Sequence, residues 1–298
     1  MRLGSPAMTS RAFINAALLC TLGVLWVSGL AGCSRSMADA DPTLFPDPTD
    51  NTITFWGHAC VYIDVDGYGI VTDPVFQKTT DWRRRKVPAP PPASYANTGV
   101  ILVSHGHSDH LNANTIRTFP ESATVLCSEP SAKYLTDIPQ NVVVMKIGDE
   151  YEYPGGRIVA VAAHHTGGRF GLSAKADGRA LGYVVYTPQA VIYYTGDTNY
   201  FRGIDDIGIK YRPDVAIINV NGHLHSSDAI LAAFATGALT VIPAHFGAYG
   251  YLWFGTRKVP RNYDKIETML EPVLLFLKLG ESAPLTGKRG MSKEKVLP

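Results

Sequence analysis

Three histidines and one aspartate fall within six positions of the segment VSHGHSDHL, Val103–Leu111. The segment follows the apolar run GVILV, whose β-branched residues are typical of a strand buried on both faces of a sheet. We therefore expect a central strand that delivers four metal-binding side chains at its carboxyl end. This feature constrains the fold, because the cluster needs further ligands from distant parts of the chain.

Later apolar runs end on side chains of the same types. His164 and His165 follow one run, Asp197 follows another, and His245 follows a third. Adjacent strands that end at one sheet edge bring residues far apart in the sequence to one place. The sequence therefore predicts that these strand ends converge on the Val103–Leu111 segment.

The secondary structure predicted around these motifs is mixed. Asp66-Gly67 lies between two alternating runs, which predicts a tight hairpin. SSDAILAAFATG, Ser226–Gly237, has a serine at its start and a glycine at its end, as a helix does. The apolar spacing at 263–280 predicts a second helix, broken by Pro272. Many short strands and fewer helices indicate an α/β fold with sheets at its centre.

The cluster suits a transition metal, because imidazole and carboxylate are ligands that zinc and related ions accept. His105 and His107 can reach one ion together, while Asp109 and His110 point to a second position. Each half lacks at least one nitrogen, and a carboxylate is needed between them. The later strand ends offer these groups, although the HH pair leaves the choice between its two histidines open.

The amino-terminal residues predict export. Met1–Arg11 carry basic and no acidic residues, an almost uncharged stretch follows, and LAGC, Leu30–Cys33, resembles a lipoprotein lipobox. We expect a signal peptide at 1–32 and a diacylated Cys33; an uncleaved membrane anchor is the alternative. Residues 33–51, rich in Pro and Asp, predict a linker, and residues 52–298 predict one large domain, or two halves that share one interface. The chain would then be a membrane-tethered protein of the bacterial cell envelope, facing the periplasm or the outer surface.

The charge and cysteine content of the chain limit the partners and bonds that the sequence predicts. With 27 basic and 26 acidic residues, the chain has no charge excess that would favour nucleic acid. Cys60 and Cys127 could form a disulfide in an oxidising compartment, or remain buried thiols in their apolar runs. The basic run DWRRRK at 81–86 is interpreted as a solvated face. His58 and His223 are interpreted as structural or peripheral.

SHGHSDHL matches the H-x-H-x-D-H motif of the metallo-β-lactamase superfamily, and the later His, Asp and His occur in that superfamily's order. The opening hairpin at 53–76, GDTNYF and the block at 225–247 resemble two branches of it. These are the ascorbate-6-phosphate lactonase-like and the N-acyl-phosphatidylethanolamine phospholipase D-like proteins. The resemblance implies an αββα sandwich, in which two central mixed β-sheets are flanked by helices.

The resemblance also implies a ligand set. The first metal would be held by His105, His107 and His165, and the second by Asp109, His110 and His245, with Asp197 bridging. His165 is preferred to His164 on the same pattern. Two Zn²⁺ ions are expected, although Mn²⁺ or iron suits the same ligands.

Further roles follow from the resemblance. His225 matches a histidine that interacts with substrate in the phospholipase branch, and Asp73 matches an acid that accepts an imidazole N–H behind the ligands. Ser108 and Thr166-Gly167 depart from the phospholipase pattern, which weakens transfer of the lipid substrate but leaves the metal ligands intact.

Two cations that share a water make hydroxide available near neutral pH. We expect this hydroxide to attack a carbonyl carbon or a phosphorus, with Asp109 orienting it and His225 donating a hydrogen bond or a proton. The sequence thus predicts a dinuclear zinc hydrolase of a phosphodiester, lactone or related ester, small or lipid-derived. The alternative is a non-catalytic zinc-binding lipoprotein with a coordinatively closed site.

Overall fold

The computed structural model describes Phe45 and residues 51–80, 83–166, 179–220, 226–251, 263–271 and 273–287. The chain divides into two compact units, Met1–Asp39 and Ala40–Pro298, and every described residue belongs to the second. The predicted signal peptide, Cys33 and nearly all of the predicted linker lie outside the described residues. Within the described part of the chain, no helix has the length and apolar character needed to cross a membrane.

The first sheet has seven strands in the order β16-β1-β2-β3-β6-β7-β8. Its strands are β1 (Thr52–Gly57), β2 (Cys60–Val65), β3 (Tyr68–Thr72), β6 (Thr98–Val103), β7 (Thr124–Cys127), β8 (Asn141–Val144) and β16 (Ser282–Pro284). From β16 to β3 each neighbouring pair is antiparallel, whereas β3, β6, β7 and β8 run parallel to one another. The strand before the histidine motif is therefore a central parallel strand, as its continuous apolar run predicts.

The second sheet has six strands in the order β14-β13-β12-β11-β10-β9. Its strands are β9 (Glu150–Tyr153), β10 (Gly156–Ala162), β11 (Leu181–Tyr186), β12 (Val191–Tyr194), β13 (Val215–Asn219) and β14 (Thr240–Ala244). β11 is antiparallel to both β10 and β12, and β12, β13 and β14 are parallel. The carboxyl ends of β10, β12, β13 and β14 therefore lie at one edge of this sheet.

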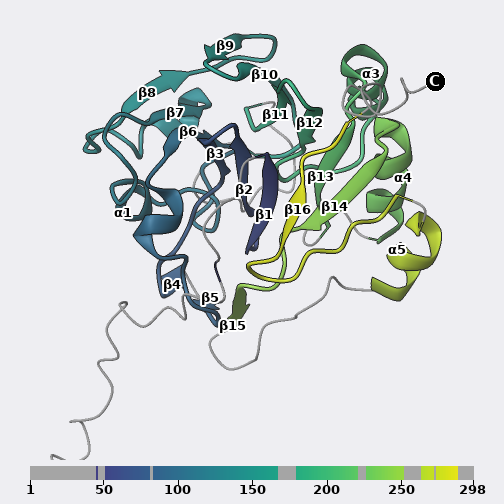
Figure 1. Cartoon of the computed structure of the whole chain (residues 1–298), viewed down its shortest axis with the longest axis horizontal. Coiled ribbons are helices and arrows are strands. Elements are labelled where there is room, and N and C mark those ends of the chain that lie inside the picture. Colours follow the sequence, from purple (N-terminus) through teal and green to yellow (C-terminus); the bar gives the residue numbers. More distant parts are fainter. Residues whose placement is uncertain are drawn as a thin grey trace, which may run out of the picture. The chain divides into compact units, whose positions relative to one another are not determined.

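Short elements complete the unit. A small third sheet joins β4 (Thr79–Thr80), β5 (Arg83–Arg85) and β15 (Tyr249–Tyr251). The helices are η1 (Pro92–Tyr95), α1 (Ala113–Ile116), α2 (Glu129–Ala132), α3 (Gly203–Tyr211), α4 (Ser226–Thr236) and α5 (Tyr263–Leu270). In Figure 1, α3, α4 and α5 lie beside β12–β14, and α1 lies on the far side of the first sheet.

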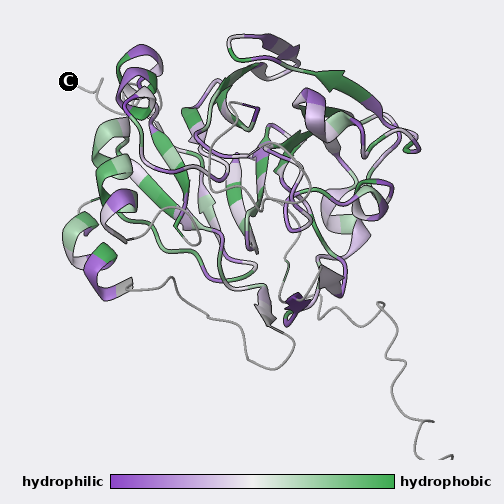
Figure 2. Ribbon diagram, turned by 180° about the vertical axis from the view of Figure 1, so that it is seen from behind, coloured by the Kyte–Doolittle hydropathy of each residue, from purple (hydrophilic) through white to green (hydrophobic). Residues whose placement is uncertain are grey.

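Two apolar clusters show how these elements are layered. The larger cluster joins Phe55 and Leu102 of the first sheet to Ile192 of the second, and continues into α3, α4 and α5. The smaller cluster lies on the opposite face of the first sheet, where Ile101 and Val103 pack with Ile116 of α1. In Figure 2, strands at the centre of the unit carry much of the green, hydrophobic colour, whereas the helices beside them mix green with purple. The predicted α/β sandwich with two central mixed sheets flanked by helices is confirmed.

Several predicted local features are also found. Asp66 and Gly67 both have positive φ and close the hairpin between β2 and β3. Gly237, with φ +62°, follows the last residue of α4. The second predicted helix is shorter than its apolar pattern suggests, because α5 ends at Leu270 before Pro272. The residues after it run beside β14, where the Val241 N–H donates to the carbonyl of residue 273 (2.7 Å).

One buried hydroxyl joins the two sheets next to the motif. The Tyr183 hydroxyl, on β11, donates towards the carbonyls of Val103 (2.8 Å) and Leu126 (3.1 Å) in the first sheet. Leu181, on the same strand, donates its N–H to the carbonyl of Ser104 (2.9 Å). These bonds hold the carboxyl end of β6 against the second sheet.

Replacing Tyr183 by Phe removes this inter-sheet donor, and we expect it to lower the free energy of unfolding by about 1–2 kcal/mol. Urea denaturation of the full chain measures the change. Tyr193→Phe is the matched control, because Tyr193 is equally buried and no described group lies within hydrogen-bonding distance of its hydroxyl. Equal losses in the two variants would contradict the assigned role of Tyr183.

Candidate metal centre

The histidine motif forms a tight turn between β6 and α1. The N–H groups of His110 and Leu111 both donate to the carbonyl of His107, at 3.0 and 2.8 Å. Asn112 then begins α1, its side-chain oxygen accepting the N–H of Thr115 (2.9 Å). His105, Asp109 and His110 are buried. The turn therefore places four metal-binding side chains of one short segment at the interface of the two sheets.

The first cluster consists of three imidazoles. His107 Nδ1 lies 2.8 Å from His105 Nε2 and 3.2 Å from His165 Nε2. His165 comes from the residues after β10, so two strand ends meet here. His107 Nε2 lies 3.2 Å from the hydroxyl of Thr166, which leaves Nδ1 to face the other two rings. Three nitrogen ligands can thus converge on one ion.

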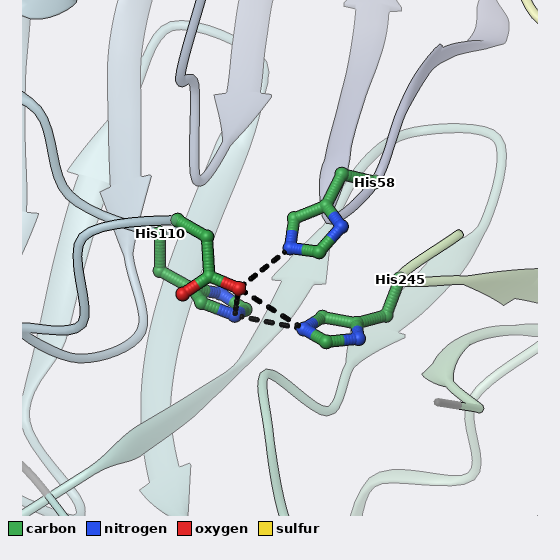
Figure 3. Close-up of side chains that lie close together, drawn as sticks. His58, His110 and His245 are labelled. Carbon is green, nitrogen blue, oxygen red and sulfur yellow. Dashed lines mark hydrogen bonds and ion pairs between the residues drawn. The ribbon is translucent and has the colours of Figure 1, made fainter. Parts of the chain in front are cut away.

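The second cluster joins His58, Asp109, His110 and His245. His110 Nε2 lies 3.1 Å from His245 Nε2, and Asp109 Oδ2 lies 3.8 and 3.7 Å from these two nitrogens. Figure 3 shows the rings of His58, His110 and His245 turned towards one another. Four potential ligand atoms therefore surround a second position beside the first cluster.

Asp197, which follows β12, lies against the second cluster. Its Oδ2 is 3.2 Å from His110 Nε2 and 3.3 Å from His245 Nε2, and its Oδ1 accepts the side-chain N–H of Asn219 (3.0 Å). The preceding Gly196 has φ +58°, and a Cβ there would lie 2.7 Å from the Cβ of Ser104. Only glycine therefore lets this turn approach the histidine motif closely enough.

Asp73, directly after β3, is the hydrogen-bond acceptor behind both clusters. Its Oδ1 accepts the backbone N–H of Ser104 (2.7 Å). Its Oδ2 accepts the Ser104 hydroxyl (2.6 Å), His110 Nδ1–H (2.7 Å) and the Tyr194 hydroxyl (2.6 Å). The Ser104 oxygen in turn lies 2.9 Å from His105 Nδ1. The geometry agrees with the predicted position of Asp73 behind the ligands.

These hydrogen bonds decide whether the donors fit a metal. A protonated Nδ1 on His110 and on His105 leaves each Nε2 with a lone pair that points to the centre of its cluster. Lone pairs of several imidazoles facing one another repel unless a proton or a cation lies between them. The nitrogen and oxygen donors therefore fit transition-metal ions such as zinc.

The charges of the buried groups support the same fit. Burial, and then the neighbouring His110, hold the pKa of His105 well below its usual value. Burial opposes ionisation of His110 as well, but the carboxylates of Asp197 and Asp109 outweigh it and raise its pKa well above its usual value. Burial likewise opposes the charge of these two carboxylates, but His110 keeps both pKa values well below the usual one. Asp109 and Asp197 are therefore buried as charged carboxylates, and protons on the neighbouring imidazoles or a bound cation must balance them.

The geometry distinguishes among the histidines. His165 lies in the first cluster, whereas His164 is exposed and its ring packs against Phe201 at 5.8 Å. His225 and His223 lie outside the described residues. His58, interpreted from the sequence as structural or peripheral, lies inside the second cluster. Its sequence signal was the WGHAC turn between two strands, where His58 has φ +59°, a conformation in which His is enriched.

The interpretation of DWRRRK as a solvated face is wrong for two of its arginines. Arg83 Nη1 donates to Asp109 Oδ2 at 2.5 Å. The guanidinium of Arg85 is buried and donates to backbone carbonyls, including that of Val75 (2.9 Å). Arg84, between them, is exposed. Arg83–Arg85 form β5, in which alternate side chains point to opposite faces. Arg83 and Arg85 therefore face the interior, whereas Arg84 faces solvent.

The two cysteines of the domain are not bonded to each other. Cys60 and Cys127 are free and buried. Burial raises the pKa of the Cys127 thiol to about 12 and also raises that of Cys60. Of the two alternatives left open by the sequence, the structure therefore shows buried neutral thiols.

The fold and the donor set together define a metallo-hydrolase class. Residues 68–246 match the family described as a beta-lactamase superfamily domain, which is more than half of the chain. A UPF0173 metal-dependent hydrolase from Methanoregula boonei is 32% identical over 202 residues, covering 66% of this chain and 82% of the relative. The chain belongs to this superfamily, and within it to the metal-dependent hydrolases.

Solved structures show the same fold. Igni18, a metallo hydrolase from Ignicoccus hospitalis, has a TM-score of 0.58 at 23% identity, covering 79% of this chain and 98% of that one. An isothiocyanate hydrolase from Delia radicum gut bacteria has a TM-score of 0.62 at 18% identity, covering 79% and 99%. Because both structures are less than 25% identical to this chain, they show that the fold is shared and nothing about substrate.

Replacing Asp73 by Asn should disturb the second cluster. An amide nitrogen cannot accept the N–H of His110, so the ring would no longer be held in one tautomer. We expect the affinity for metal to fall by about 10–100-fold, the usual effect of losing such an outer hydrogen bond. Competition against a chromophoric chelator measures it. Asp206→Asn, at an exposed position of α3, is the control and should bind metal normally.

Proposed function

We propose that this metal-dependent hydrolase binds two ions, most simply Zn²⁺, and cleaves a phosphodiester, a lactone or a related ester. The observation that carries the proposal is the pair of adjacent donor clusters, one of three imidazoles and one of imidazoles with a carboxylate. Two such clusters fit two ions better than one, because their donors point to two separate centres. The relatives' description as metal-dependent hydrolases supports the reaction class.

Each proposed ion has its own ligands. His105, His107 and His165 would hold the first, and Asp109, His110 and His245 the second. Asp197 would lie between them. Its oxygen contacts His110 and His245, and its charge also acts on His105 to raise that ring's pKa against burial and His110. These contacts with the second cluster and this influence on the first support a bridging role.

The proposal favours an enzyme over a store of zinc, because the relatives are described as metal-dependent hydrolases. When bound, the ions supply Lewis acidity and lower the pKa of water, so that hydroxide is available near neutral pH.

The chain's own groups would direct the reaction. Asp109 would accept a hydrogen bond from the attacking water and orient it towards the carbonyl carbon or phosphorus. Arg83 and His58, which contact Asp109 Oδ2, would keep that carboxylate in place. In the proposal His225, which lies outside the described residues, donates a hydrogen bond or a proton to the substrate.

Metal removal tests the proposal. Dialysis against a chelator should abolish turnover in a screen of bis(p-nitrophenyl) phosphate, simple lactones and phospholipids, and added Zn²⁺ should restore it. Elemental analysis should find two ions per chain in the native protein, and about one in His165→Ala and in His245→Ala. His164→Ala is the matched control and should keep both. Two ions without any turnover would favour the alternative of a zinc-binding lipoprotein.

We also propose that the enzyme is tethered to the bacterial cell envelope through diacylated Cys33. The lipobox-like LAGC after an almost uncharged stretch supports this. In this proposal, the Pro- and Asp-rich segment at 33–51 links the lipidated cysteine to the hydrolase domain.

Cys33→Ser should release the protein from the membrane fraction and abolish incorporation of radiolabelled palmitate, because the thiol that carries the lipid is gone. Cys60→Ser is the control, since that thiol is buried and cannot be acylated. Palmitate labelling that persists in Cys33→Ser would contradict lipidation at this position.

A further inference from the structure

His58 is tied by its backbone to the strand end that carries His245. Its N–H donates to the carbonyl of Phe246 (2.6 Å), and its carbonyl accepts the N–H of His245 (2.6 Å). Both histidines have positive φ, +59° and +69°. Such a conformation persists only where the surroundings hold it. The turn after β1 and the end of β14 therefore form one rigid pair.

The ring of His58 is fixed as firmly as its backbone. It packs against the His245 ring, with centroids 4.1 Å apart, and meets the Tyr249 ring edge to face at 5.3 Å. The side chain is buried. This packing directs His58 Nε2 to Asp109 Oδ2 at 2.9 Å, a contact that is drawn in Figure 3.

The contact identifies His58 as a donor. A carboxylate oxygen has only lone pairs, so a ring nitrogen 2.9 Å away is held there by its proton. Arg83 donates to the same oxygen from β5. His58 thus meets the cluster as a donor to one of its ligands, whereas His110 and His245 face each other with their Nε2 atoms 3.1 Å apart.

We propose that His58 is a positioning residue for the second metal ion, and that it acts by fixing Asp109 relative to His245. The inference rests on the proposed two-ion site. A single residue bonds His245 through its backbone and Asp109 through its ring, so these two ligands from distant segments keep their separation of 3.7 Å. His58 therefore acts through Asp109 and takes no place among the ligands.

Zinc titration of the full-length chain in detergent tests this role. His58→Ala should weaken binding of the second ion by about 10–100-fold, as loss of an outer hydrogen bond does, and should leave the first ion's affinity unchanged. His58→Gln retains an N–H donor and should restore the second affinity to within about threefold of the native value. His164→Ala, an exposed histidine, should match the native protein at both sites.

The outcomes separate the inference from the proposed function. If His58→Gln loses the second ion as His58→Ala does, the ring nitrogen is itself a ligand and the positioning role is wrong. Native-like binding of both ions by His58→Ala would also overturn it. A native chain that binds only one ion would instead refute the two-ion site itself. Unchanged first-ion affinity in each variant verifies that the domain remains folded.

Discussion

The site depends on one buried carboxylate. Asp73 follows β3 and accepts hydrogen bonds from Ser104, His110 and Tyr194, which belong to both sheets. A buried carboxylate is costly unless its lone pairs are satisfied, and four donors here satisfy them. Asp73 accepts the Nδ1–H of His110, and Ser104, which donates to Asp73, lies within hydrogen-bonding distance of His105 Nδ1, so one ring is oriented in each cluster. The same hydrogen bonds therefore connect the two sheets and orient the metal-binding rings.

The sheet topology explains why distant residues meet. β3 and β6 are parallel in the first sheet, and β10, β12 and β14 run the same way in the second. Their carboxyl ends therefore lie at matching edges, where turns are free to carry polar side chains. The two sheets pack on a shared apolar core, and this packing brings the two edges together. The irregular backbone is confined to the turns at these edges. Glycine at 196 permits one of these approaches, the one to Ser104.

The two clusters differ in their outer contacts, and this difference bears on mechanism. The first cluster contacts hydroxyl groups, Ser104 at His105 and Thr166 at His107. The second is surrounded by carboxylates, and one of these, Asp109, receives donors from His58 and Arg83. Positive charge from Arg83 near the second position offsets the excess of buried carboxylates. In the proposed two-ion site, this difference would give the two ions unequal electrostatic surroundings.

The sequence alone determined the donor types, the central buried strand, the hairpin at Asp66-Gly67 and the order of the strand ends, because each is written in local pattern. It could not choose between His164 and His165, since adjacent residues in a turn face opposite sides and only the packing against Thr198 and Phe201 decides which is exposed. For His58 it offered only the WGHAC turn and for Arg83 no signal, because both reach Asp109 across contacts between segments 26 to 51 residues apart. Local chemistry is encoded residue by residue, whereas proximity across sheets arises only when the whole core packs.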